Sequence, residues 1–230
     1  MRTLSRKPRA ILFDMDGVIV DSMPYHFIAW YEALRPYGVR VSCFEVYRRE
    51  GEQWDKSLAD FLRMGGHVPT QRLMHKVFSA RQRIFRKYFK RTIFPGVEGF
   101  LSCLAGKGYA LALVTGTPHK QVMHILPSSI RKFFSCMVTG DMVSRGKPHP
   151  EPYLKACRLL KLPCNECLVV ENAPFGIESA RRAGIYSVAL TTSLPEGYLS
   201  GADHIVDSLE EIPVFIDRAC SAARNKRRNA

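Results

Sequence analysis

The chain alternates short apolar runs with longer segments in which apolar positions recur every three to four residues. The short runs predict buried strands, and the longer segments predict amphipathic helices. The predicted strands are residues 10–13, 110–114, 137–139, 168–170 and 186–190, and the predicted helices between them are residues 97–106, 120–129, 150–161 and 176–183. This order is typical of an α/β fold, a Rossmann-like parallel sheet with helices on both faces.

One segment, residues 21–92, breaks the alternation, because helical periodicity dominates it and strand-like runs are missing. The sequence Phe94-Pro95-Gly96 follows it, and proline and glycine punctuate secondary structure strongly. We therefore predict a core domain of residues 1–20 and 93–230 with a helical cap domain, residues 21–92, inserted into it. Within the cap, residues 78–89 predict a helix with phenylalanines on an apolar stripe and arginines on a solvated face.

The composition is that of a globular protein. Of the 230 residues, 46% are hydrophobic and 24% are charged. No apolar stretch approaches the roughly 20 residues of a membrane helix, and the short apolar run before Asp14 argues against a signal peptide. Seven scattered cysteines indicate a reducing compartment, so we expect a cytoplasmic protein, as a monomer. Cys164 and Cys167 have metal-ligand spacing, but without a second pair nearby we interpret them as ordinary structural residues.

The net charge of +13 raises the question of a nucleic-acid partner, since phosphate backbones attract basic surfaces. The basic residues gather near the two ends, residues 2–9 and 224–228, and in residues 81–91. We expect the ends to be frayed, solvated tails. For the middle stretch we expect a solvated helix face, ahead of a site that draws anionic substrate inward. The chain offers no aromatic and basic platform of the kind used by single-strand binders, so nucleic acid is not the expected partner.

The ends of the predicted strands carry the candidate chemistry, because ligands of open parallel sheets bind beyond the carboxyl ends of the strands. Asp14 and Asp16 follow the first strand, and a spacing of two puts both carboxylates on one side of an extended chain. One can attack phosphorus as a nucleophile while the other acts as acid and then base. Alternating aspartates also begin calcium loops, but the preceding strand and the missing ligands at loop positions five and twelve argue against calcium.

Three further strand ends fit the same chemistry. Thr115, after the second strand, offers a hydroxyl group and nearby backbone amides to phosphate oxygens. Lys147 stands before a proline-started helix and can neutralise a phosphoryl group. Glu171 and Asn172 follow a buried strand and offer oxygen ligands suited to Mg²⁺.

In this order, the motifs DMDGV at residues 14–18 and GKPHPEPY at residues 146–153 resemble the haloacid dehalogenase superfamily over nearly the whole chain. The segment DMDGVIVDSMPYHFIAWYEAL, residues 14–34, is similar to the helical-cap branch that contains beta-phosphoglucomutase and many small sugar phosphatases. An acid two residues after the nucleophile distinguishes the chain from the dehalogenases and phosphonatases of the superfamily. The resemblance therefore implies phosphate ester chemistry.

The resemblance also implies roles for individual residues. Asp14 would form an aspartyl-phosphate, Asp16 would protonate the leaving oxygen and then activate the acceptor, and Thr115 and Lys147 would hold the phosphoryl oxygens. Mg²⁺ would lie among oxygens of four residues, namely the Asp14 carboxylate, the Asp16 backbone carbonyl, Glu171 and Asn172. Residues expected to contact the substrate are His26, Trp54, Lys56, Gly116 and Thr117. The alternatives are that His26 packs within the first cap helix and that Trp54 anchors the cap on the core. Members of the family usually carry an acid where this chain has Asn172, which predicts weaker magnesium affinity without loss of catalysis.

The same intermediate serves a phosphatase and a sugar-phosphate mutase, which differ in the group that accepts the phosphoryl group. A mutase must also grip a second phosphate. Alignment with the mutase cap loop puts Trp54 in place of its arginine, and Pro118 falls in place of a lysine. Cations that could compensate are Lys56, Arg83, His119 and Lys120. We therefore expect a magnesium-dependent phosphatase acting on a small phosphorylated metabolite, such as a sugar phosphate, ahead of a mutase and of a binding protein that has lost the chemistry.

Overall fold

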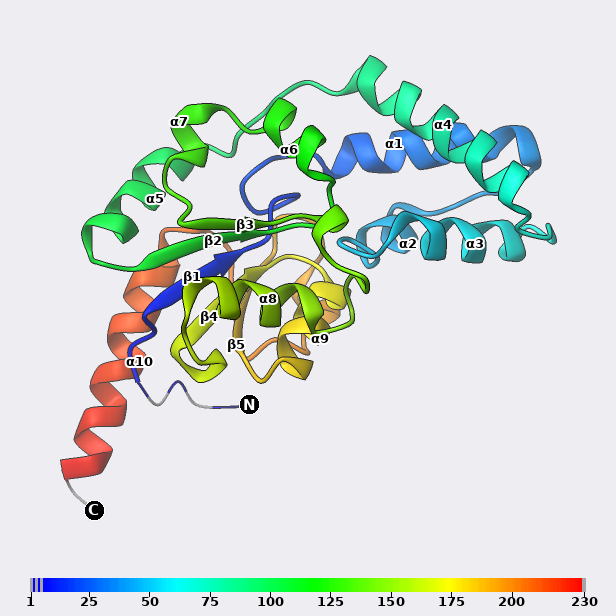
Figure 1. The fold of residues 1–230 in the computed structure, drawn as a ribbon. Coiled ribbons are helices and arrows are strands. Elements are labelled where there is room, and N and C mark those ends of the chain that lie inside the picture. The colour runs from blue at the N-terminus through cyan, green and yellow to red at the C-terminus, as the bar shows by residue number, and fades with distance from the viewer. Residues whose placement is uncertain (1, 3, 5, 229–230) are drawn as a thin grey trace.

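The computed structural model describes residues 2, 4 and 6–228, with residues 222–228 described by their backbone alone. Six parallel strands form one sheet in the order β3-β2-β1-β4-β5-β6 (Figure 1). The strands are β1 Ala10–Phe13, β2 Ala110–Val114, β3 Cys136–Val138, β4 Cys167–Glu171, β5 Tyr186–Leu190 and β6 His204–Val206. The helices are α1 Met23–Leu34, α2 Cys43–Tyr47, α3 Trp54–Met64, α4 Gln71–Tyr88, α5 Val97–Gly106, α6 His119–Ile125, α7 Ser128–Arg131, α8 Glu151–Leu160, α9 Pro174–Arg182 and α10 Glu211–Arg228.

The strand order creates a switch point beside β1. The chain winds outward from β1 through β2 to β3, and then returns to place β4 on the other side of β1. Phe13 is level with Leu113 of β2 and with Val170 of β4. The residues that follow these three therefore emerge together at the carboxyl edge, where open parallel sheets bind their ligands.

Both faces of the sheet are covered by helices. In β1, Ile11 and Phe13 belong to an apolar cluster with residues of α5, α6, α7 and α10, whereas Ala10 and Leu12 pack with α8 and α9. Figure 1 shows α5 and α7 on the opposite side of the sheet from α8 and α9. Strands buried on both faces have no polar face, which explains why they read as continuous apolar runs. The predicted Rossmann-like α/β fold is confirmed.

Residues 21–92, all of which the structure describes, contain helices α1 to α4 and no strand. These helices share an apolar cluster of their own, whose largest buried members are Trp30, Leu34, Leu58, Phe61 and Leu62. Figure 1 shows the four helices gathered to one side of the sheet. A separate core is what a distinct domain requires, and the division into core and cap at these boundaries remains our prediction.

Some predicted elements differ from those observed. The expected helix over residues 120–129 is two helices, α6 and α7, because Leu126 is extended (φ −86°, ψ 124°). The next residue, Pro127, disfavours a helical conformation before it and lacks an N–H group. Strand β6 was not predicted, since its three residues are too few to show a period. Helix α4 begins before residue 78, where Thr70 accepts a hydrogen bond from the Leu73 N–H.

The prediction of frayed basic tails is wrong where the structure describes them. Arg2 pairs with Asp203 at 2.5 Å and donates to the carbonyl of Ile185, and Arg9 pairs with Glu166 at 2.8 Å. Carboxylates near the amino ends of β4 and β6 meet these arginines, which the local sequence does not reveal. At the other end, the backbone of residues 224–228 continues helix α10. None of the described helices combines the length and hydropathy needed to cross a membrane.

Candidate active site

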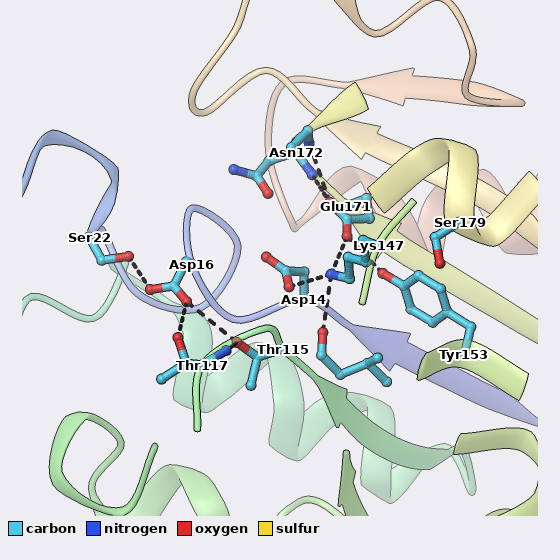
Figure 2. Close-up of polar contacts among 12 residues, drawn as sticks. Asp14, Asp16, Ser22, Thr115, Thr117, Lys147, Tyr153, Glu171, Asn172 and Ser179 are labelled. Atoms are coloured by element: carbon cyan, nitrogen blue, oxygen red, sulfur yellow. Dashed lines mark hydrogen bonds and ion pairs between the residues drawn. The ribbon is translucent and has the colours of Figure 1, made fainter. Parts of the chain in front are cut away.

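Lys147 joins the ends of three strands at the carboxyl edge of the sheet (Figure 2). Its Nζ lies 2.6 Å from Oδ1 of Asp14, 2.6 Å from Oε1 of Glu171 and 3.2 Å from the carbonyl oxygen of Val114. These contacts use all three donors of the ammonium group. Burial favours the neutral amine, but Asp14 and Glu171 outweigh it and raise the pKa of Lys147 above its ordinary value. The side chain is therefore a buried cation at neutral pH.

Glu171 is held in place by four donors. Its Oε1 accepts hydrogen bonds from Lys147 and from the Tyr153 hydroxyl at 2.7 Å, and its Oε2 accepts from the backbone N–H groups of the next two residues. A Cβ at Gly176 would lie 1.8 Å from Oε1, so only glycine fits against this carboxylate. The position of Glu171, and through it that of Lys147, is thus fixed by β4, α8 and α9.

Asp16 faces a different set of groups. Its Oδ1 accepts from Ser22 at 2.5 Å and lies 3.1 Å from His26 Nε2, and its Oδ2 accepts from Thr117 at 3.1 Å. Thr115 is a more distant donor, at 3.5 Å. Figure 2 shows the Asp16 carboxylate turned toward Ser22 and Thr117. Burial opposes its ionisation, but His26, Ser22 and Thr117 outweigh burial and hold the pKa of Asp16 below its ordinary value.

His26, on the first cap helix, connects Asp16 to Arg81 of α4. The Arg81 guanidinium can only donate, so Nδ1 of His26 accepts from it and the ring proton lies on Nε2, facing Asp16. Burial, reinforced by the charge of Arg81 and opposed by Asp16, lowers the pKa of His26. Phe85 stacks on the ring with centroids 4.7 Å apart. His26 is therefore neutral at pH 7, and the structure brings it to Asp16 from the cap.

The buried charges of the site do not balance. One ammonium, Lys147, faces the carboxylates of Asp14 and Glu171, and Asp16 adds a third carboxylate. Burial first, and then Glu171 and Asp16, raise the pKa of Asp14 to about 8 against the opposing effect of Lys147. Oδ2 of Asp14 and Oδ1 of Asn172 are buried and have no hydrogen-bond partner among the described residues. An added cation would satisfy both observations, because unpaired buried acceptors and excess negative charge are costly.

The residues present fit Mg²⁺, which prefers oxygen ligands. Figure 2 shows the carboxylate of Asp14 and the amide of Asn172 on the same side of Lys147. Within the described residues, no three His, Cys, Asp or Glu side chains are arranged to hold a metal by themselves, so amide or backbone oxygens must complete the set. The unpartnered oxygens favour Asp14 and Asn172 as ligands, and the role of the Asp16 carbonyl remains a prediction. The contacts do not favour the expected ligand role of Glu171, whose oxygens already have four donors.

A cavity of about 370 Å³ lies between the cap and the core, next to the groups that bind Asp16. Four of the five residues expected to contact a substrate line it, namely His26, Trp54, Gly116 and Thr117. Trp54 stacks on Phe78 with ring centroids 3.9 Å apart and an angle of 16°. Lys56, the fifth, is exposed and is not part of the lining. The volume is typical of a small-molecule site.

The sequence analysis missed four residues that complete the site. Arg81 lies three positions after Phe78 and four before Phe85, so an arginine on the buried stripe of its helix was a usable signal. Tyr153 stands in the GKPHPEPY motif, but nothing local shows that it reaches a strand end. Ser22 and Glu50 gave no signal, because their contacts depend on how the cap segment folds back.

Two carboxylates, a lysine and threonine hydroxyls at the switch point of a parallel sheet define a site for phosphoryl transfer, which depends on positioning and charge stabilisation. Comparison with known proteins agrees, since a model of the haloacid dehalogenase-like hydrolase family matches residues 8–184. The chain belongs to this hydrolase family.

Relatives and solved structures support this membership in detail. The chain is 31% identical to a phosphorylated carbohydrates phosphatase of Thermotoga maritima, over 82% of this chain and 88% of that protein. It is 30% identical to a phosphoglycolate phosphatase of Cupriavidus necator, over 95% of this chain and 97% of that protein. A candidate beta-phosphoglucomutase structure from Bacteroides vulgatus matches with a TM-score of 0.80 and 31% identity, covering 94% of this chain and 90% of that one. The relatives named as phosphatases support a phosphoric monoester hydrolase.

Proposed function

We propose that the protein is a magnesium-dependent phosphatase that releases phosphate from a small phosphorylated metabolite, a sugar phosphate, through an aspartyl-phosphate on Asp14. The observation that carries the proposal is the position of Lys147, 2.6 Å from the carboxylates of both Asp14 and Glu171. A buried ammonium beside a carboxylate with one free oxygen is the arrangement that phosphoryl transfer needs. As expected from the sequence, we take the protein to act as a cytoplasmic monomer.

In this proposal an oxygen of Asp14 attacks phosphorus, and the bond from phosphorus to the leaving oxygen breaks. Asp16, which its lowered pKa leaves ionised in the free site, takes up the proton of a substrate phosphate monoanion and gives it to that oxygen. It then takes a proton from the water that attacks the aspartyl-phosphate, which restores Asp14 and releases phosphate. Lys147 and Thr115 offset the charge on the phosphoryl oxygens. Bound Mg²⁺ would neutralise part of the charge on the carboxylate and the phosphoryl group.

The cavity favours water over a sugar phosphate as the acceptor. Trp54 and Pro118, which replace the cations of a mutase clamp, both line it. The four cations that could have compensated, Lys56, Arg83, His119 and Lys120, are all exposed and do not line it. A mutase therefore ranks second, supported by the likeness to the Bacteroides vulgatus structure.

The test is release of phosphate from a generic aryl phosphate with and without Mg²⁺. We expect activity that requires Mg²⁺ and is abolished in Asp14→Asn. The matched control is Asp203→Asn, which alters another buried aspartate, one that bonds Arg2 and Ser187 at the start of β6; it should keep the activity. Activity retained in a folded Asp14→Asn protein would defeat the assignment.

Two further measurements separate the alternatives. Interconversion of hexose phosphates in the presence of a bisphosphate primer would favour the mutase. Salt-dependent nucleic-acid binding without any phosphatase activity would favour a binding protein.

A further inference from the structure

Glu50 lies on the cap loop between α2 and α3 and lines the same cavity as His26 and Thr117, two of the groups that contact the Asp16 carboxylate. The residue is half-buried. The Gly51 N–H lies beside its carboxyl group, but no side-chain donor among the described residues bonds to it. Glu50 therefore has hydrogen-bonding capacity left for a molecule in the cavity, close to the carboxylate that would protonate the leaving oxygen.

Both guanidinium groups of the cavity bond to groups of the protein through a terminal nitrogen, while Nε of each is buried without a hydrogen-bond partner among the described residues. Arg49 pairs with Glu52 at 2.9 Å and with Asp60 at 3.0 Å. Arg81 donates to His26, and Glu50 opposes the lowering of the Arg81 pKa by burial. Four carboxylate side chains line the cavity against these two cations, namely Glu50, Glu52, Asp55 and Asp141. The lining is net negative even when Glu50, whose pKa is raised, carries a proton, because three carboxylates then face two guanidinium groups.

The raised pKa of Glu50 agrees with a negatively charged environment. Burial first, and then the charges of Asp16 and Asp14, raise its pKa well above the ordinary value, and Lys147 opposes them only in part. A carboxylate or a second phosphate on a substrate would meet the same desolvation and the same neighbouring charges. An uncharged leaving group avoids this cost.

The aromatic part of the lining suits such a leaving group. The stacked rings of Trp54 and Phe78 line the cavity together with Trp30. Aromatic faces pack against the apolar C–H surface of a polyol or sugar, while its hydroxyl groups require hydrogen-bond acceptors such as a carboxyl oxygen.

Resting on the phosphatase function proposed above, we propose that the site selects a phosphate ester of an uncharged polyhydroxyl compound, and that Glu50 is a specificity-determining residue. It accepts a hydrogen bond from a hydroxyl group near the phosphorylated position, and the cavity rejects leaving groups that carry a carboxylate. Overall sequence identity does not distinguish an uncharged from a carboxylate-bearing substrate, because the carbohydrate phosphatase is 31% identical to the chain and the phosphoglycolate phosphatase 30%.

The first experiment compares kcat/KM for three substrates at saturating Mg²⁺: an aryl phosphate, a hexitol phosphate and phosphoglycolate. The hexitol phosphate should exceed phosphoglycolate by at least about 100-fold, because rejection by unpaired buried charges is strong. Equal rates, or faster hydrolysis of phosphoglycolate, would overturn the inference while leaving the phosphatase assignment intact. No hydrolysis even of the aryl phosphate would defeat the phosphatase assignment itself, and the inference with it.

The second experiment assigns the selection to Glu50. Glu50→Ala should lower kcat/KM for the hexitol phosphate about tenfold more than for the aryl phosphate, mainly through KM. Glu50→Gln retains an acceptor oxygen and should recover part of that loss. Asp55→Asn, at another carboxylate of the same lining, should change the ratio of the two substrates by less than about twofold.

The opposite results would overturn the role of Glu50. Equal losses for both substrates in Glu50→Ala would mean that the residue supports the fold or the chemistry in general. An equal effect of Asp55→Asn would mean that only the overall charge of the cavity matters.

Discussion

Nζ of Lys147 lies 2.6 Å from Oδ1 of Asp14, although the two residues are 133 positions apart in the chain. The ammonium is shared with Glu171, so it neutralises only part of the negative charge around Asp14. Because of the remaining negative charge, ionisation of Asp14 in the metal-free site is energetically unfavourable. It also links the protonation of Asp14 to the binding of a cation.

Magnesium affinity should therefore depend on pH. The pKa of Asp14 is raised to about 8, so below that pH the metal-free carboxyl group is mostly protonated. A metal ligand must be ionised, so binding of Mg²⁺ releases a proton, and the affinity should rise with pH and level off above about pH 8. Calorimetric titrations in buffers of different ionisation enthalpy would measure both quantities. Affinity that stays constant from about pH 6 to pH 8 would contradict this linkage.

Asn172→Asp should tighten magnesium binding. Oδ1 of Asn172 is buried without a partner, and its Nδ2 donates to Ser193 at 2.8 Å, a hydroxyl that an aspartate could instead accept from. The added charge should lower the Kd for Mg²⁺ about tenfold, ~1.4 kcal/mol. It should also lower the melting temperature without metal, because it adds another buried carboxylate.

Thermal melts across a magnesium titration would measure both effects. Asn165→Asp, at an exposed position before β4, should change neither. If Asn172→Asp leaves the affinity unchanged, Asn172 does not contact the metal.

Tyr153→Phe should destabilise the protein. The Tyr153 hydroxyl is fully buried and donates to Oε1 of Glu171 at 2.7 Å. Removing one donor to a buried carboxylate should cost about 1–3 kcal/mol of the free energy of unfolding. Urea denaturation would measure this loss, with Tyr198→Phe at a half-exposed position as the control. Equal stability of the two variants would show that Lys147 and the backbone satisfy Glu171 without the tyrosine.

Gly116→Ala should impair catalysis more than stability. A Cβ at Gly116 would lie 2.9 to 3.1 Å from backbone atoms of Gly51 on the cap loop. The methyl group would push the cap loop away from the core, and we expect kcat/KM to fall about tenfold, since misplacement by about 1 Å is costly to catalysis. The free energy of unfolding should change by less than about 1 kcal/mol.

The matched control is Gly99→Ala in helix α5, where a Cβ meets nothing within 4 Å. It should raise the free energy of unfolding by about 0.5–1 kcal/mol and leave kcat/KM unchanged. Unimpaired activity of Gly116→Ala would show that the contact with Gly51 does not set the position of the cap.

The sequence predicted those features that local patterns control. Runs buried on both faces marked five of the six strands, and the spacing of Asp14 and Asp16 placed two carboxylates at a strand end. The absence of strand-like apolar runs from residues 21–92 indicated the helical insert. The local pattern failed at α6 and α7, where Pro127 ends one helix before the next begins, and at the short strand β6.

Tertiary structure decided the partners. The pairing of Lys147 with Asp14 and Glu171 requires β1 and β4 to be neighbours in the sheet. The hydroxyl of Tyr153 reaches Glu171 only because helix α8 packs against the sheet. Arg81 reaches His26 only after the cap helices have packed together. Such contacts join residues far apart in the chain, and their energies depend on burial and on neighbouring charges. Neither burial nor these neighbouring charges exist until the chain has folded. The sequence therefore identified the chemical groups, and the fold determined which of them contact one another or line the same cavity.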